Sequence, residues 1–151
     1  MWQRFVIVIG RIFEGDIFII GALDKILNWS DSLAQLDAVF SDWKAYVTNI
    51  GFLEGAFNVL APMSSVILVI AVALELVGGI SVVIGFKPQF GAFCLILFMI
   101  PTTVLVHHYW YLDGQTRLLE LIAFTKNISI LGGLFVLWAS TSLVNKLRAH
   151  T

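Results

Sequence analysis

Residues 63–86 read MSSVILVIAVALELVGGISVVIGF, a run that is apolar or small throughout except for the carboxylate of Glu75. At 1.5 Å per residue, a helix of this length spans the roughly 30 Å hydrocarbon core of a bilayer. An acid facing lipid there costs about 2.5–3.5 kcal/mol, so we expect Glu75 to face other helices. The stretch therefore predicts a membrane protein with a buried ionisable group, and so a candidate site.

The composition of the whole chain agrees with lipid as its solvent. Its 151 residues are 59% hydrophobic and 13% charged, against roughly 45–50% and 25% in a soluble domain. The length fits one domain, residues 1–151. The net charge is −1 and no basic tract stands out, so we expect no nucleic-acid partner. A single cysteine, Cys94, excludes dithiol chemistry by this chain alone, and we expect it to be buried.

Hydropathy divides the chain into predicted transmembrane helices and one further helix. The four spans cover residues 5–23, 63–86, 90–106 and 121–144. Gly85 and Pro88 both resist helix continuation, so a tight turn makes the second and third spans an antiparallel pair. The predicted fold class is all-α, an integral membrane four-transmembrane-helix bundle with an extra amphipathic helix between the first two spans.

The extra helix is predicted over residues 31–48, where apolar side chains recur at helical spacing. Ser32-Leu33-Ala34-Gln35 has the pattern of a capping box at its start. We expect this helix to rest on the membrane or to cap the bundle. Gly51 and Gly55 follow it, and we expect them to loosen the chain before the second span.

The first span differs from the others because it carries charge. Arg11 and Glu14 stand three residues apart on a stripe of polar and small residues along one helix face, and they could pair. Such a stripe on an otherwise apolar helix suits the inside of a bundle. An amphipathic helix lying on the membrane surface is the alternative.

Four spans place both termini on one side of the membrane. That side would carry Arg4, Lys87, Lys146 and Arg148 and no acid, whereas the opposite side carries both acids and bases. The Lys and Arg counts of the two sides differ little, but the short Lys87 turn and the basic C-terminus favour the cytoplasm for this side. We therefore expect a multi-pass protein of the cell membrane with cytoplasmic termini.

Ionisable groups lie on the predicted inward faces of several spans. Buried charges need partners, so we expect Glu75 to pair with Arg11 or Lys126 and to fix helix register. The other reading, compatible with the first, is that these groups and His107 line a polar cavity that binds a head group or passes protons. The candidate buried polar or ligand cluster comprises Arg11, Glu14, Glu75, His107, Trp110, Lys126 and Asn127.

The adjacent histidines His107 and His108 do not predict a metal site. Neighbouring side chains on a helix point about 100° apart, and no further ligands stand at metal-binding spacing. The chain also shows no Gly-rich phosphate loop, nucleophile elbow or haem-attachment motif. We therefore expect no metal and no cofactor held by this chain alone.

The order and spacing of several short motifs resemble the DoxX family of small four-helix membrane proteins. The matching pieces are Gly10-Arg11, Gly15, Phe18, Gly21, Lys25, Trp29, Glu75-Leu76-Val77-Gly78-Gly79, Pro101-Thr102-Thr103, His107, Trp110, Lys126-Asn127 and Gly132-Gly133. Glu14 and Asp16 depart from the pattern, as does the long acidic connection before the second span. The resemblance implies a bundle of four transmembrane helices.

The family is named for a subunit linked to thiosulfate oxidation with quinone as acceptor. The resemblance therefore implies a membrane subunit of an oxidoreductase assembly with a quinone site. If the chain is enzymatic, it acts as a quinone-linked subunit together with a protein partner that supplies electrons. His107 with Glu75 or Lys126 would then supply or orient protons, and the ring would lie beside Trp110.

Two other functions fit the same residues. In the first, the chain is a non-catalytic scaffold or assembly factor, alone or as a homo-oligomer, whose buried charges serve packing and whose 31–48 helix docks a partner. In the second, the chain is a small proton-linked transporter or channel, with Arg11, Glu75 and Lys126 as a relay. In both alternatives the chain is embedded in the lipid bilayer.

Overall fold

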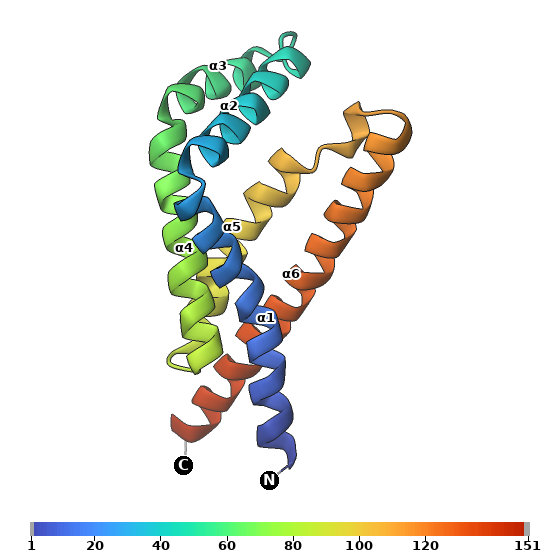
Figure 1. The fold of residues 1–151 in the computed structure, drawn as a ribbon. Coiled ribbons are helices and arrows are strands. Elements are labelled where there is room, and N and C mark those ends of the chain that lie inside the picture. Colours follow the sequence, from blue (N-terminus) through green and yellow to red (C-terminus); the bar gives the residue numbers. More distant parts are fainter. Residues whose placement is uncertain (1, 150–151) are drawn as a thin grey trace.

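The computed structural model describes residues 2–149, with side-chain surroundings for residues 2–140. Its regular structure over these residues is entirely helical, so the all-α prediction is confirmed (Figure 1). The elements are α1 (Trp2–Leu27), α2 (Trp29–Tyr46), α3 (Gly51–Leu60), the 3-10 turn η1 (Ala61–Met63), α4 (Ser64–Ile84), α5 (Pro88–Val106), the 3-10 turn η2 (Tyr109–Tyr111) and α6 (Gly114–Ala149).

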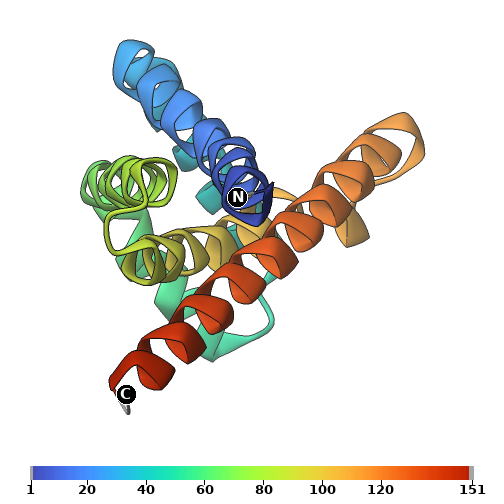
Figure 2. The ribbon, with the colours of Figure 1, turned by 90° about the horizontal axis from the view of Figure 1, so that it is seen from below.

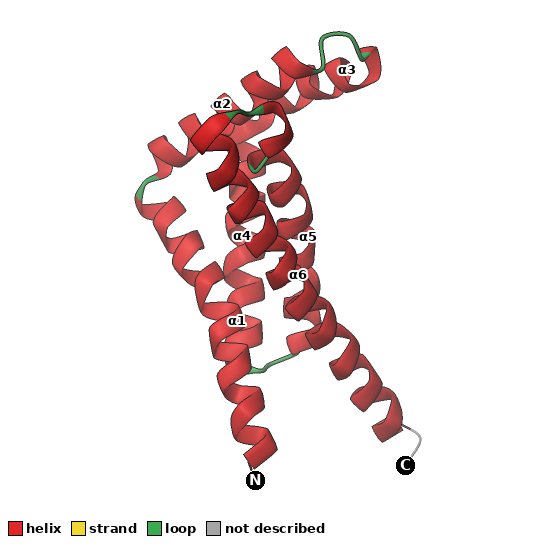
Figure 3. Cartoon of the chain, turned by 90° about the vertical axis from the view of Figure 1, so that its right-hand side faces the viewer, coloured by secondary structure: helices red, strands yellow, loops and turns green. Residues whose placement is uncertain are grey.

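Four of these helices alternate in direction along the long axis of the molecule. α1 packs against α4, α4 against α5, and α5 against α6. α2 and α3 cover one end of this arrangement, while both chain ends and the α4–α5 turn lie at the other (Figures 1 and 3). α1 and α6 run at an angle to each other (Figure 2), and in Figure 3 they lie apart at the end that holds the termini.

Three described segments are long and apolar enough to cross a membrane, and they are Gly51–Ile84, Pro88–Tyr111 and Gly114–Ser140. They include or overlap the predicted spans 63–86, 90–106 and 121–144, although the side chains of 141–144, like those of Lys146 and Arg148, are outside the described residues. The predicted first span, 5–23, is helical as part of α1 but is not among the three, because it carries Arg11, Glu14 and Asp16.

Glycine lets α4 approach both of its neighbours. A Cβ added to Gly79 would lie 3.0 Å from the carbonyl oxygen of Gly15 on α1. A Cβ added to Gly78 would lie 3.0 Å from the carbonyl oxygen of Gly91 on α5. Backbones this close leave no room for a larger residue, so these contacts set the register of α4 against α1 and α5.

The predicted turn between α4 and α5 is confirmed. Gly85 ends α4 with φ 77°, and Lys87 has φ 47° before Pro88 opens α5. Ser81 Oγ lies 2.6 Å from Phe86 O and 3.1 Å from Lys87 O, which holds the turn against α4. The two helices are therefore antiparallel neighbours, as the sequence predicts.

The helix predicted over residues 31–48 is present as α2, but its start differs. α2 begins at Trp29, and Ser32 N donates to Asn28 O at 3.0 Å inside the first turn. Ser32 is therefore not an N-cap, and the predicted capping box is wrong. The chain turns from α1 into α2 at Asn28 alone, and the Asn28 side chain bonds back to Asp24 Oδ1 at 2.8 Å instead.

The segment after α2 is more ordered than predicted. Gly51 and Gly55 do not loosen the chain but lie within α3. The reason is tertiary, because Phe57 of α3 packs with Phe40 and Trp43 of α2 in a buried aromatic cluster. α2 and α3 thus cap the bundle, which confirms one of the two predicted placements for the connection.

Candidate functional site

An ion pair joins α1 to α4 inside the bundle. Lys25 Nζ lies 2.9 Å from Glu75 Oε2 and 3.0 Å from Oε1. The Glu75 side chain is 4% exposed and that of Lys25 is 28% exposed. Lys25 Nζ also donates to Gly21 O at 3.3 Å and lies 5.6 Å from the centre of the Phe98 ring. The charge of the buried Glu75 carboxylate is therefore neutralised by the Lys25 ammonium group, whose side chain is still partly exposed.

The prediction that Glu75 pairs with Arg11 or Lys126 is wrong. α1 and α4 are antiparallel and touch at Gly15 and Gly79. This register puts the C-terminal part of α1, with Lys25, beside Glu75 and sends Arg11 toward the other end of α4. Lys126 lies on α6 and is exposed. Lys25 lies on the polar stripe of α1, so the sequence predicts the helix face that carries it. The sequence does not predict its position along the bundle axis relative to Glu75.

A pocket of about 650 Å³ lies beside this ion pair, between α1, α2, α4 and α5. Most of its wall is apolar, and the aromatic rings of Phe40 and Phe98 form part of it. Lys25 lines the pocket, and the exposed residues Asp24 and Asp31 form a polar rim. The pocket therefore combines an apolar interior, one ammonium group and an acidic entrance.

A second cleft, of about 980 Å³, lies at the end of the molecule that holds the termini. Its lining comes from α1, from α6 and from the α4–α5 turn, and includes Arg11, Glu14 and Lys87. Within the described residues, the buried atoms Arg11 Nε and Glu14 Oε1 have no hydrogen-bond partner. The predicted pairing of Arg11 with Glu14 is therefore not formed.

Glycines make the space that these two side chains occupy. A Cβ added to Gly133 of α6 would lie 2.8 Å from Glu14 Oε1. A Cβ added to Gly85 would overlap the guanidinium group of Arg11. The carboxylate and the guanidinium group thus point toward different helices, which explains why the two charges do not meet although they stand three residues apart.

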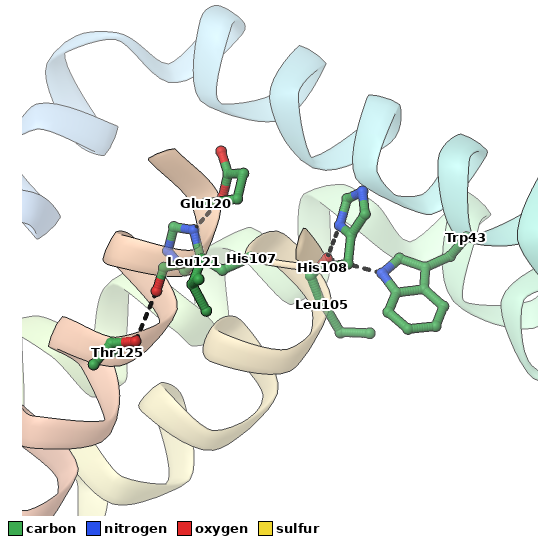
Figure 4. Close-up of polar contacts among 7 residues, drawn as sticks. All are labelled: Trp43, Leu105, His107, His108, Glu120, Leu121 and Thr125. Carbon is green, nitrogen blue, oxygen red and sulfur yellow. Dashed lines mark hydrogen bonds and ion pairs between the residues drawn. The ribbon is translucent and has the colours of Figure 1, made fainter. Parts of the chain in front are cut away.

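The opposite end of the bundle holds the two histidines (Figure 4). His107 Nδ1 lies 2.7 Å from Glu120 Oε2 and so connects the end of α5 to α6. The carbonyl oxygen of Leu105 accepts bonds from Trp43 Nε1 at 2.8 Å and from His108 Nδ1 at 2.9 Å. These bonds satisfy a carbonyl at the C-terminal end of α5 and tie it to the α2 cap.

Trp110 belongs to an aromatic cluster at this same end. Its ring lies 6.2 Å from the Trp43 ring and 6.0 Å from the Phe124 ring, both edge-on. Next to them, Tyr46 and Tyr111 stack with ring centres 4.1 Å apart. The cluster joins α2, η2 and α6, so it serves the packing of the cap.

The structure thus distributes the predicted cluster over separate places rather than around one cavity. Arg11 and Glu14 line the cleft at the end that holds the termini, called the lower cleft below. Glu75 pairs with Lys25 beside the pocket between α1, α2, α4 and α5, called the upper pocket. His107 and Trp110 lie at the capped end, while Lys126 is exposed and Asn127 half-buried on α6. As ligand-binding residues, all seven remain predictions.

The remaining reactive side chains form no further candidate site within the described residues. Cys94 is buried, as predicted. Over the described residues, no group of three or more His, Cys, Asp or Glu side chains could hold a metal ion. Two ion-pair partners, Lys25 and Glu120, could not be identified from the sequence. Lys25 pairs with a residue far away along the chain, and Glu120 pairs across a turn whose shape the local sequence does not determine.

Comparison with known proteins places the chain among membrane proteins. The DoxX family model matches residues 6–108, which run from α1 to the end of α5. Inner membrane protein YphA of Escherichia coli (strain K12) is 30% identical over 131 residues, covering 87% of this chain and 79% of the relative. No solved structure matches. The chain is therefore an integral membrane protein of the DoxX family.

Proposed function

We propose that this chain is the membrane subunit of an oxidoreductase assembly and binds a quinone in the pocket between α1, α2, α4 and α5. One observation carries the proposal: a single ammonium group, Lys25 Nζ, lines a pocket of about 650 Å³ whose wall is mostly apolar. Small-molecule sites have this size and this combination of an apolar wall with a few oriented polar groups.

The hydrogen-bonding capacity of Lys25 suits a ring carbonyl. An ammonium group has three N–H donors. Lys25 donates hydrogen bonds to Glu75 Oε1 and to Gly21 O, and its 2.9 Å contact with Glu75 Oε2 is an ion pair without hydrogen-bond geometry. The remaining donor can serve a carbonyl oxygen of a ligand in the pocket, and the rings of Phe40 and Phe98 offer apolar faces for a quinone ring.

The charges around the pocket favour a neutral ligand. Glu75 balances the charge of Lys25. Asp24 and Asp31 at the rim add negative charge at the entrance. A phosphate or carboxylate ligand would meet this like charge, whereas a neutral ring with carbonyl acceptors would not.

The same groups can move protons during reduction of a quinone. Conversion of a quinone to a quinol takes up two electrons and two protons. We assign the electrons to a redox-active protein partner. One proton goes to each ring oxygen. Lys25 donates the first to the oxygen that it bonds and is reprotonated from water at the rim by way of Asp24 and Asp31, and the other oxygen takes the second proton from water that enters the pocket.

We also propose that α1 is a fourth membrane span. It has 26 residues, or about 39 Å at 1.5 Å per residue, and it runs antiparallel along α4. Three of its charged side chains turn toward other helices, with Arg11 at Gly85, Glu14 at Gly133 and Lys25 at Glu75. Its outward face is Ile, Val and Phe, as suits lipid.

Four spans place both chain ends on one face of the membrane, and we propose the cytoplasmic face of the inner membrane. The relative YphA is called an inner membrane protein. Lys87 in the short α4–α5 turn lies at the same end as the termini (Figure 1), and cations in short loops favour the cytoplasm. The quinone pocket then opens near the opposite face.

Titration of decylubiquinone into the purified protein in lipid nanodiscs tests the proposal. We expect saturable binding of one molecule per chain, weakened about tenfold or more in Lys25→Met by loss of a charged hydrogen-bond donor. Ala71→Leu narrows the pocket without removing a charge and should weaken binding similarly. Lys44→Met, a cation on α2 outside the pocket lining, is the matched control.

Two readouts separate binding from folding. Circular dichroism and unfolding curves identify variants that have lost structure, and Ala71→Leu keeps the Lys25–Glu75 pair intact. Absence of saturable binding to the folded wild-type protein would overturn the quinone proposal. Equal binding to wild type, Lys25→Met and Ala71→Leu would place the quinone elsewhere on the chain.

A further inference from the structure

The cleft between α1, α6 and the α4–α5 turn contains charged groups that the quinone proposal does not use. We infer that it binds the head group of an amine-bearing zwitterionic phospholipid, with the phosphate on Arg11 and Lys87 and the ammonium on Glu14. This site is about 980 Å³ and is lined by different residues from the quinone pocket. The inference therefore stands independently of that proposal.

The first argument is the pair of unsatisfied polar atoms. Over the described residues, four buried side-chain atoms have no hydrogen-bond partner: Arg11 Nε and Glu14 Oε1 at this cleft, Thr103 Oγ1, and Glu75 Oε2, which lies 2.9 Å from the Lys25 ammonium group. Leaving a buried polar group unpaired is costly, and more so for a charged one. A ligand that carries both an acceptor anion and a donor cation would satisfy both atoms at once.

The second argument is the arrangement of the two charges. Arg11 and Glu14 stand three residues apart on α1, a spacing that puts their Cβ atoms roughly 5–6 Å apart. Their charged ends diverge, toward Gly85 and toward Gly133. The phosphate and the ammonium of an ethanolamine head group are likewise separated by a short linker, so they can meet the two side chains separately instead of neutralising each other.

The third argument is the apolar part of the cleft. Ile7, Phe90 and Val136 line it together with the charged groups. α1 and α6 diverge at this end, so the cleft opens between two helices that carry exposed apolar side chains (Figure 3). Such a surface suits an acyl chain, which makes a membrane lipid a better occupant than a soluble phosphate compound.

The charge balance selects among lipids. Arg11 and Lys87 together attract a phosphate, as basic groups at the membrane surface do. An anionic lipid without an amine would leave Glu14 unsatisfied. A choline head group carries a cation but no N–H, so it cannot donate to the Glu14 carboxylate. The expected order of binding is therefore phosphatidylethanolamine above phosphatidylglycerol and phosphatidylcholine.

Native mass spectrometry of the protein in nanodiscs made from equal parts of these three lipids tests the order. We expect wild type to retain phosphatidylethanolamine about tenfold over phosphatidylcholine, the effect of one charged hydrogen bond. Soluble phosphoethanolamine added in competition should not displace the lipid, because it lacks the acyl chains. Displacement by the soluble compound would identify a phosphate-ester site rather than a lipid site and would overturn the inference.

Substitutions then assign the head-group contacts. Glu14→Gln keeps the shape of the side chain, and we expect it to reduce the preference over phosphatidylcholine to about threefold or less. Glu54→Gln on α3 is the matched control and should retain the wild-type preference. Arg11→Gln should lower retention of all phosphate lipids, with the exposed Arg117→Gln as its control.

The inference can be rejected without relying on any one variant. Equal retention of the three lipids by wild type would overturn it, whatever the variants do. An unchanged preference in folded Glu14→Gln would do the same. Quinone binding uses the other pocket, so decylubiquinone titration of the same samples shows whether a failure concerns the lipid site alone.

Discussion

The α1–α4 contact and the α1–α6 cleft place charges of one helix in opposite situations. At the first, Lys25 meets a carboxylate buried on α4. At the second, Arg11 and Glu14 face glycines and keep unpaired buried atoms within the described part of the chain. Over residues 2–140, one helix thus carries a charge that the fold pairs and two charges that the fold leaves without a charged partner. The two cases should respond to mutation in opposite ways.

The largest expected effect comes from breaking the paired side of the comparison. Lys25→Met leaves the Glu75 carboxylate buried without a cation, and we expect a loss of about 3–5 kcal/mol in the free energy of unfolding. Chemical unfolding in detergent micelles, followed by circular dichroism, measures it. The double variant Lys25→Met with Glu75→Leu should recover much of the loss, and Lys44→Met should change little. A double variant as unstable as the single one would show that the pair is not the cause.

The next effect concerns the close packing that positions the paired helices. A Cβ on Gly91 would lie 2.8 Å from both Gly78 O and Ser81 Cβ. Gly91→Ala should therefore cost about 1–3 kcal/mol of unfolding free energy, the usual range for overpacking. Gly132→Ala is the matched control, because nothing lies within 4 Å of its added Cβ. Equal unfolding curves for the two variants would contradict the tight α4–α5 contact.

A smaller effect of opposite sign is expected on the unpaired side. Glu14→Gln removes a charge that has no partner at Oε1, so in lipid-free detergent it should raise the free energy of unfolding by about 1 kcal/mol. The same unfolding assay as for Lys25→Met gives the direct contrast, with Glu54→Gln alongside. Destabilisation by Glu14→Gln in the absence of phospholipid would indicate a partner for the carboxylate within the protein.

The smallest effect is expected at the capped end. His107 Nδ1 and Glu120 Oε2 are 2.7 Å apart, but their side chains are 21% and 32% exposed. A partly exposed ion pair contributes about 0–1 kcal/mol. His107→Gln should therefore change the unfolding midpoint only slightly and leave decylubiquinone binding as in wild type. A large loss of quinone binding would contradict this expectation and would support the role predicted from the sequence, in which His107 supplies or orients protons.

Sequence reasoning located the helices well because hydropathy and turn chemistry are local. The turn at Gly85 and Lys87 and the inward face of Glu75 both follow from short stretches. The partner of Glu75 did not follow, because it depends on how far α1 slides along α4. That register is fixed by the contact of Gly15 with Gly79, and each of these glycines alone is compatible with many registers.

Dependence on tertiary contacts also explains why the sequence did not predict α3 or the true positions of the candidate site residues. α3 forms because Phe57 finds an aromatic cluster on α2, a gain that the local preference of Gly51 and Gly55 cannot reveal. The seven predicted site residues were grouped by helix face alone. A helix face predicts which side chains point into the bundle but not their positions along its axis. Residues at three different positions along the axis were therefore predicted to form one cluster.

Photo-crosslinking with an azide-bearing quinone tests the central claim most directly, because it compares the pocket with the cleft in one sample. The wild-type protein in nanodiscs would be irradiated with the probe, digested and mapped by mass spectrometry. The account predicts labels on residues of the upper pocket, such as Phe40, Ala71 and Leu97, and their loss in excess decylubiquinone. Competed labels on Ile7, Phe90 or Val136 of the lower cleft, or no competed label at all, would contradict it.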